Sequence, residues 1–134
     1  MSELLGSDEI EERARGLTWA HDRGAGALPN LLAALRDPAA GVRAQVWAMI
    51  AVGVVGPAVV DDVRDVLVEK LSGPSPTVRR ASIRTLMALD DVASREAIAR
   101  LLTDDTLDPS AWFDDDATVA QAARSALDAL DRPR

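Results

Sequence analysis

The side chains best suited to chemistry in this sequence lie in two short segments. One is a run of three aspartates at positions 114–116, and the other is His21-Asp22. A carboxylate that folds against an apolar surface has its pKa raised toward the range used in proton transfer, and imidazole titrates near neutrality. These groups are therefore candidate acid–base residues of a cofactor-free lyase, cyclase or isomerase. The candidate catalytic residues are Asp114, Asp115, Asp116 and His21.

Most other chemistries are disfavoured by residue type or spacing. The chain has no cysteine, which removes thiol nucleophiles, disulfides and cysteine-based metal sites. The aspartate run lacks the alternating ligands and central glycine of a calcium loop, so we expect no metal. The glycines of GLTWAHDRGAGA match neither a Walker loop nor a dinucleotide fingerprint, so we expect no cofactor. His21 ends a predicted helix, where the helix dipole favours an imidazolium over a base.

The composition predicts a single domain built from helices. Of 134 residues, 48% are hydrophobic but only 3% are aromatic, so Ala, Leu, Val and Ile must fill the core. A net charge of −7 argues against a nucleic-acid partner, which needs a cationic surface. The apolar stretch 46–60 is shorter than the roughly 20 residues of a membrane span, and Gly56-Pro57 interrupts it. With no secretory signal at the start, we expect a cytoplasmic protein, and the preference for arginine over lysine suggests a bacterial one.

Three stretches of the chain repeat one helical pattern. Each begins with Val, at positions 42, 78 and 119, and has apolar or small residues three, four, seven, eight and eleven positions later, with Gln45 as the exception. This spacing places them on one side of a helix. A helix of a second type precedes each stretch, so the helices alternate as antiparallel pairs. The predicted fold is all-α, a right-handed α-solenoid of about three and a half stacked helix pairs in one domain, residues 1–134. Its predicted segments are a divergent first helix 8–22, helix pairs 25–55, 58–89 and 93–130, and an inserted loop 104–118.

Two dipeptides indicate where helices begin. Asp37-Pro38 and Ser75-Pro76 each offer a capping side chain followed by proline at the first helical position. They precede the helices that begin with Val42 and Val78.

The Val-Arg pairs at 42–43 and 78–79, followed by small residues, resemble the HEAT-like repeats first associated with phycobiliprotein lyases. The resemblance covers roughly residues 8–130, and the last copy departs from it, with Ala120 in place of arginine. It implies a solenoid that most often serves as a protein-binding scaffold. Some members resemble lyases, and others resemble DNA-repair glycosylases, which are longer and basic.

The repeats also predict which side of each helix faces water. Positions two, five, six and nine after each Val should point away from the buried side, toward the concave face. In the second repeat these positions carry no charge, and an uncharged face is expected to be buried. Its cover is the first helix, which carries Trp19, or a second copy of the chain, or a ligand. The predicted ligand- or partner-binding residues are Trp47, Ala51, Arg80, Ile83, Arg84, Met87, Trp19, Trp112 and Phe113.

The last repeat contains an insertion. Asp37 precedes Val42 by five positions and Asp104 precedes Val119 by 15, so the second connection is ten residues longer. Long loops in compact domains are commonly functional, and the Trp-Phe pair of this loop will seek an apolar surface. Either the loop takes part in binding, or its tryptophan covers the end of the solenoid while the aspartates 114–116 cap the last helix.

The leading functional hypothesis is an interaction module. It binds a protein, a peptide or a compact apolar or anionic ligand on the concave face, over an apolar floor around Trp47 with a rim of arginines. The alternative is a small-molecule tailoring enzyme that works in the same groove with an aspartate of the 104–118 loop or with His21. A homodimer that covers the same face is a third arrangement.

Overall fold

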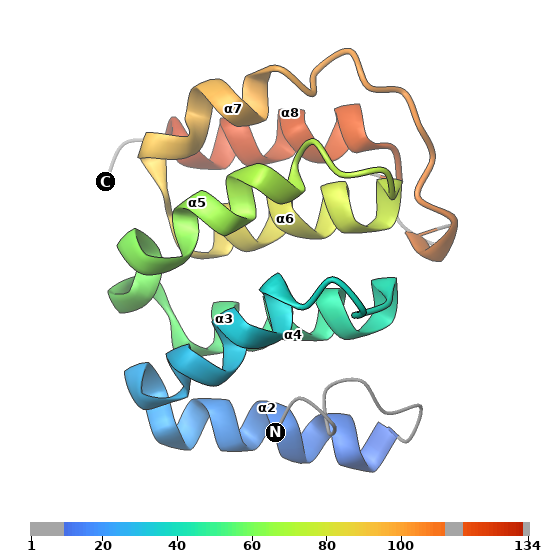
Figure 1. The fold of residues 1–134 in the computed structure, drawn as a ribbon. Helices are drawn as coiled ribbons and strands as arrows, with labels where there is room; N and C mark the ends of the chain where they lie inside the picture. The colour runs from blue at the N-terminus through green and yellow to red at the C-terminus, as the bar shows by residue number, and fades with distance from the viewer. Residues whose placement is uncertain (1–9, 112–116, 133–134) are drawn as a thin grey trace.

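The computed structural model describes residues 10–111 and 117–132, which form an all-α solenoid. The predicted fold class is confirmed. The described part begins with one helix, α2 (Ile10–Arg23), and three helix pairs are stacked on it (Figure 1). The pairs are α3 (Leu28–Arg36) with α4 (Val42–Val55), α5 (Val60–Lys70) with α6 (Pro76–Ala88), and α7 (Arg95–Ala99) with α8 (Val119–Leu130).

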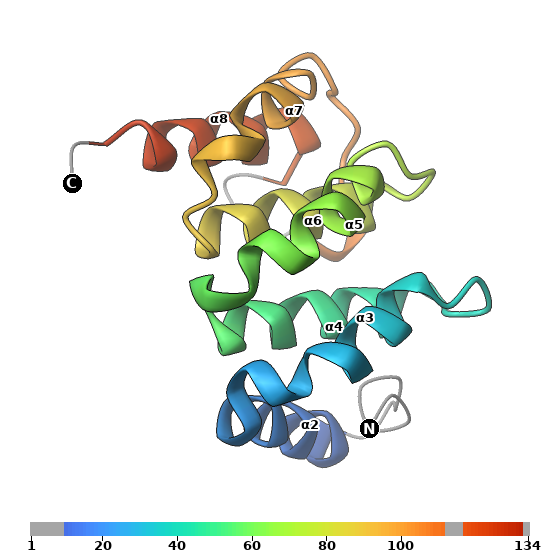
Figure 2. The same cartoon turned by 60° about the vertical axis from the view of Figure 1, so that its left-hand side comes forward.

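The helices are arranged in two rows. Each of α2, α4, α6 and α8 packs on the next, and α3, α5 and α7 cover one side of that row (Figure 2). Short 3-10 turns at 24–27, 57–59 and 92–94 lead into the helices of the second row. Gly56, with φ of +99°, lets the chain reverse after α4. The core between the rows is aliphatic, and its fully buried side chains include Leu31, Leu35, Leu67, Leu86, Leu89 and Ile98.

Helix α4 is apolar on nearly every side because it has three neighbours. It packs against α2, α3 and α6, and Ala48 and Ala51 are fully buried. The first helix, α2, packs on α4, and Trp19 and Trp47 are both partly buried against the core. No single described helix is long and apolar enough to cross a membrane. Among the described helices, the pair Val42–Val55 and Pro57–Lys70 together has that length and composition, and it is bent by 107°.

The predicted orientation of α4 is wrong. Val42 and Ile50 belong to the stripe expected to be buried, yet each is 41% exposed, whereas Ala51 is fully buried. The prediction assumed that α4 has one buried side. A helix that packs against three others is buried on three sides. Small side chains occupy the close contacts with those neighbours, and β-branched side chains are left on the fourth side. The same error places Ile83 of α6, which is fully buried, on the open side.

The capping predictions are partly confirmed. Ser75 caps α6, and its Oγ accepts a hydrogen bond from the Val78 amide at 3.3 Å. Asp37 does not cap α4. Its side chain accepts a hydrogen bond from the Ala39 amide at 2.9 Å within the turn that precedes the helix, and α4 begins only at Val42. Helix α8 is capped by Thr118 in a reciprocal pair of bonds with Gln121, both of 3.1 Å. Thr118 thus has the capping role that one of the two interpretations of the insertion gave to the aspartates 114–116.

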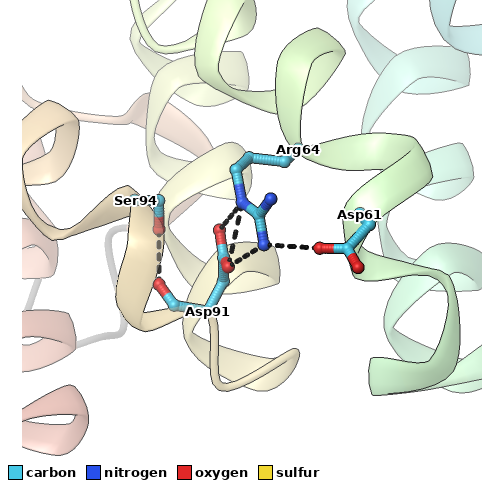
Figure 3. A network of polar contacts seen from close by, with 4 residues as sticks. All are labelled: Asp61, Arg64, Asp91 and Ser94. Atoms are coloured by element: carbon cyan, nitrogen blue, oxygen red, sulfur yellow. Dashed lines mark hydrogen bonds and ion pairs between the residues drawn. The ribbon is translucent and has the colours of Figure 1, made fainter.

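An ion-pair network joins α5 to the turn between α6 and α7 (Figure 3). Arg64 of α5 donates from Nε and Nη2 to the Asp91 carboxylate at 2.7–3.1 Å, and from Nη2 to Asp61 Oδ1 at 3.0 Å. Asp91 follows α6, is only 3% exposed, and accepts a bond from Ser94 Oγ at its main-chain oxygen. Hydrogen bonding to Asp91 raises the pKa of Arg64, although burial opposes the shift. The network therefore fixes the turn after α6 against α5.

Replacing Arg64 by alanine would leave the Asp91 carboxylate buried without its guanidinium partner. We expect the free energy of unfolding to fall by about 2 to 3 kcal/mol, since breaking a buried pair strands a charge. Urea denaturation measures this loss. The matched control is Arg95→Ala, which removes an ion pair to Asp131 whose side chains are 45% and 51% exposed and should cost less than about 1 kcal/mol. Equal losses in the two variants would contradict the assignment.

Candidate functional site

A groove runs along α4 and α6 on the side opposite α3 and α5. It consists of two adjoining hollows, of about 570 and 420 Å³, which share Val46, Thr77 and Ser110. The larger hollow lies over α4 and α6, and the smaller one lies over the first turns of α4. We call this surface the α4–α6 groove. Its apolar lining residues are Val42, Val46, Trp47, Met49, Ile50, Gly53, Val54, Ala81, Met87, Ala88 and Pro109.

The insertion forms one end of the groove. Its two ends pair with each other through an antiparallel bridge between Leu107 and Thr118 and a 2.9 Å hydrogen bond from the Asp108 amide to the Ala117 carbonyl. This pairing directs residues 108–110 to the amino-terminal half of α6. There they line both hollows of the groove.

Asp108 is a buried carboxylate that fastens the insertion to α6. Its side chain is 2% exposed, and its Oδ1 accepts bonds from Thr77 Oγ1 at 2.7 Å, from the Ser110 amide at 2.9 Å and from Ser110 Oγ at 2.8 Å. Its Oδ2 lies 3.4 Å from Arg80 Nη1. Burial acts to raise the pKa of Asp108, but these bonds and the Arg80 charge outweigh it, so the pKa is lowered. The carboxylate is therefore ionised at neutral pH.

A second ion pair holds the start of the insertion. Arg79 Nε donates to Asp104 Oδ2 at 3.0 Å, and Arg79 Nη1 donates to the Gly73 carbonyl at 2.8 Å. Burial acts to raise the pKa of Asp104, but hydrogen bonds from Thr106 and the nearby Arg79 lower it overall. The two consecutive arginines after Val78 thus anchor two successive points of the insertion.

These contacts change the acid–base hypothesis. An aspartate of the insertion does lie at the groove, but it is Asp108, and its pKa is lowered where a raised one was expected. The sequence analysis did not identify Asp104 and Asp108 as the residues that hold the insertion against α6. The available signal was the Asp-Pro-Ser segment 108–110, which repeats the Asp-Pro of the turn at residue 37.

The structure brings some predicted binding residues to the groove and removes others. Arg80, Arg84 and Met87 line the larger hollow, and Trp47 lines the smaller one. The placement of Ala51 and Ile83 on the open side is wrong, because both are fully buried. Trp19 packs against the core, with the Arg23 guanidinium carbon 5.0 Å from the ring centre, and does not line either hollow. Trp112, Phe113, Asp114, Asp115 and Asp116 lie outside the described residues.

His21 is not part of the groove. It lies in the last turn of α2, and this end of α2 is at the opposite side of the molecule from the insertion (Figure 1). Its side chain is 75% exposed, with Nδ1 3.5 Å from Asp22 Oδ1. In the part of the chain that the structure describes, no three His, Asp or Glu side chains gather as a metal site.

A family model for HEAT repeats matches residues 28–128. The chain belongs to the HEAT-repeat family. The match spans α3 to α8 and confirms the resemblance at the level of the repeat, whereas membership of the lyase-associated branch stays a prediction. No curated protein and no solved structure matches this HEAT-repeat chain significantly. HEAT repeats generally act as protein-interaction modules.

The lowered pKa of Asp108 predicts a specific pH dependence. Asp108→Asn keeps the side-chain shape but removes the charge opposite Arg80. A lowered pKa stabilises the fold above the ordinary aspartate value of 3.8, and this contribution is lost as the pH falls through the folded-state pKa. We expect the variant to be less stable by about 1 to 3 kcal/mol at neutral pH. Urea denaturation should find the same difference down to about pH 5 and a smaller one only below about pH 4. A difference that shrinks between neutral pH and about pH 5 would mean that the pKa is raised.

Proposed function

We propose that this HEAT-repeat protein is an interaction module that binds a segment of another protein in the α4–α6 groove. The observation that carries the proposal is the open side of α4, where Val42, Ile50 and Val54 are 41%, 41% and 37% exposed. Among the described residues, five large hydrophobic side chains are exposed, and these are three of them. Large apolar side chains left in water at one place mark binding surfaces.

The chemistry of the groove favours binding over catalysis. Asp108 is the carboxylate that lines it, and its four polar contacts keep it ionised and fixed in place. An ionised, saturated carboxylate is a poor proton donor and a weak base. The remaining lining is mostly aliphatic, with arginines around it. Such a surface excludes water and orients a bound chain.

The insertion supports binding by fixing one end of the groove. Asp104 and Asp108 hold it to α6 through ion pairs with consecutive arginines. Residues 109 and 110 are thereby kept beside the first turns of α4 before any partner arrives. A preformed groove avoids part of the ordering entropy that binding otherwise costs.

A glutamate placed on the groove floor tests the proposal. Peptides of about 16 residues, selected from a random displayed library on the wild-type protein, would be measured by fluorescence anisotropy on Ile50→Glu. We expect binding to weaken by about tenfold or more, since burying one large aliphatic side chain contributes about 1.5 to 3 kcal/mol. Because Ile50 is 41% exposed, the substitution leaves the core intact.

The matched control is Val92→Glu. Val92 is 46% exposed in the turn before α7 and does not line the groove, so its replacement should leave binding unchanged. Circular dichroism of both variants checks that the helices are retained. A library that yields no binder, or binders that tolerate Ile50→Glu and Val92→Glu equally, would refute the assignment of the groove.

A further inference from the structure

We infer that the segment bound in the α4–α6 groove is a short amphipathic helix of another protein, whose aliphatic side chains pack between α4 and α6. The inference rests on the proposed function and specifies the form of the partner. It draws on three observations: the arrangement of large and small side chains along the groove, the hydrogen bonds that its lining already makes, and the extent of its apolar surface.

The large apolar side chains of the groove form one row on α4. Val42, Val46, Ile50 and Val54 follow one another at every fourth residue, which places them on one side of the helix. From residue 42 to residue 54, steps of about 1.5 Å per residue make the row about 18 Å long. A row of this length matches about three turns of a second helix.

The neighbouring row, on α6, is made of small side chains. Thr77, Ala81, Thr85 and Ala88 are three or four residues apart, and all of them line the larger hollow. α4 and α6 lie side by side (Figures 1 and 2), so the two rows share one groove. A Cβ added at Gly53 of α4 would lie 3.9 Å from Ala88 Cβ, an ordinary contact between small groups. Large side chains beside a row of small ones leave room for the side chains of a third helix.

The polar groups of the lining are already hydrogen-bonded, which disfavours an extended partner. Thr77 Oγ1 and Ser110 Oγ donate to Asp108 Oδ1, and Thr85 Oγ1 donates to the Ala81 carbonyl at 2.8 Å. Between their first and last turns, α4 and α6 use their backbone groups within the helix. An extended peptide would bury amide and carbonyl groups without partners here, which is costly, whereas a helix satisfies its own backbone.

The apolar surface suits one helix better than a second copy of the chain. A groove about 18 Å long and about 10 Å wide, the usual distance between packed helices, covers about 200 Å². A stable dimer buries about 800 Å² on each partner. The apolar surface does not continue onto the next helix of the row, because the exposed side chains of α8 are all polar: Gln121, Arg124, Ser125 and Asp128.

Two uncharged synthetic peptides of about 16 residues and identical composition test the inference. One places leucines three and four residues apart among alanine and glutamine, and the other places them at every second residue, the spacing of a strand. Fluorescence anisotropy on the wild-type protein should show the first peptide binding at least about tenfold tighter. A proline at its centre should remove this advantage, because proline breaks a helix.

Ala88→Leu separates packing in the groove from general hydrophobic attraction. Ala88 is exposed at the end of α6, so the larger side chain fills the groove without entering the core. The helical peptide should bind about tenfold more weakly, since leucine occupies the space of the partner. Stronger binding would mean general attraction to added apolar surface and would overturn the inference. The control is Ala99→Leu, at the exposed end of α7 outside the groove, which should leave the affinity unchanged.

Ile50→Glu distinguishes a failure of the inference from a failure of the proposed function, and circular dichroism shows that each variant is folded. If the alternating peptide binds as tightly as the helical one and both are lost in Ile50→Glu, the helical partner is wrong and the proposed function stands. If neither synthetic peptide binds, the helical partner is wrong as well, and the peptides selected from the library decide the proposed function. If Ile50→Glu affects neither peptide, both proposals fail together.

Sedimentation at the concentrations of the peptide assay addresses the remaining occupant. The wild-type protein should be a monomer, in agreement with a groove that is open to a partner. A wild-type dimer that Ile50→Glu converts to a monomer would assign the groove to a second copy of the chain and overturn the inference.

Discussion

The packing of α4 between α2, α3 and α6 is the constraint on which the rest of this solenoid depends. A helix can have three close neighbours only if small side chains occupy the contacts, and Ala48, Ala51 and Gly53 meet that requirement. The larger side chains of α4 must then either enter the core, as Met49 and Val52 do, or remain on the fourth side. The exposed valine and isoleucine stripe is therefore a consequence of how the stack is built. Its position also decides where the groove lies, because α6 is the neighbour on that side.

The insertion depends on this arrangement in turn. Its anchors, Asp104 and Asp108, contact consecutive arginines at the start of α6, so the loop and the groove share one wall. In an apolar pocket without such partners, a carboxylate would have a raised pKa and would be suited to proton transfer. Four polar contacts instead lower the pKa of Asp108, so the carboxylate stays ionised and holds the loop in place. The contacts that would have to be removed to make it an acid are the ones that form the end of the groove.

The sequence predicted the helices far better than it predicted their faces. Val at 42, 78 and 119 with small residues behind it is a local pattern, and local patterns specify where a helix forms. Which side of α4 is open depends on how many neighbours it has, a property of the whole stack that spacing alone does not contain. Trp47 was expected to lie on the floor of the binding surface and does line the groove, but the groove also extends over Ile50 and Val54, which the spacing had placed on the buried side or left unassigned. Asp108 was missed for the same reason: its partners Thr77 and Arg80 are about thirty residues away.

The charges of α6 connect this helix to the insertion. Arg80 and Arg84 are four residues apart on one helix, a spacing at which like charges destabilise the helix by a few tenths of a kcal/mol. Arg79 and Arg80 have structural partners in Asp104 and Asp108, but both partners come from the insertion, and the four arginines share two helices that carry no acidic residue. The two helices therefore take the carboxylates that neutralise Arg79 and Arg80 from the insertion, so the end of the groove and the charge balance of α6 are formed by the same contacts.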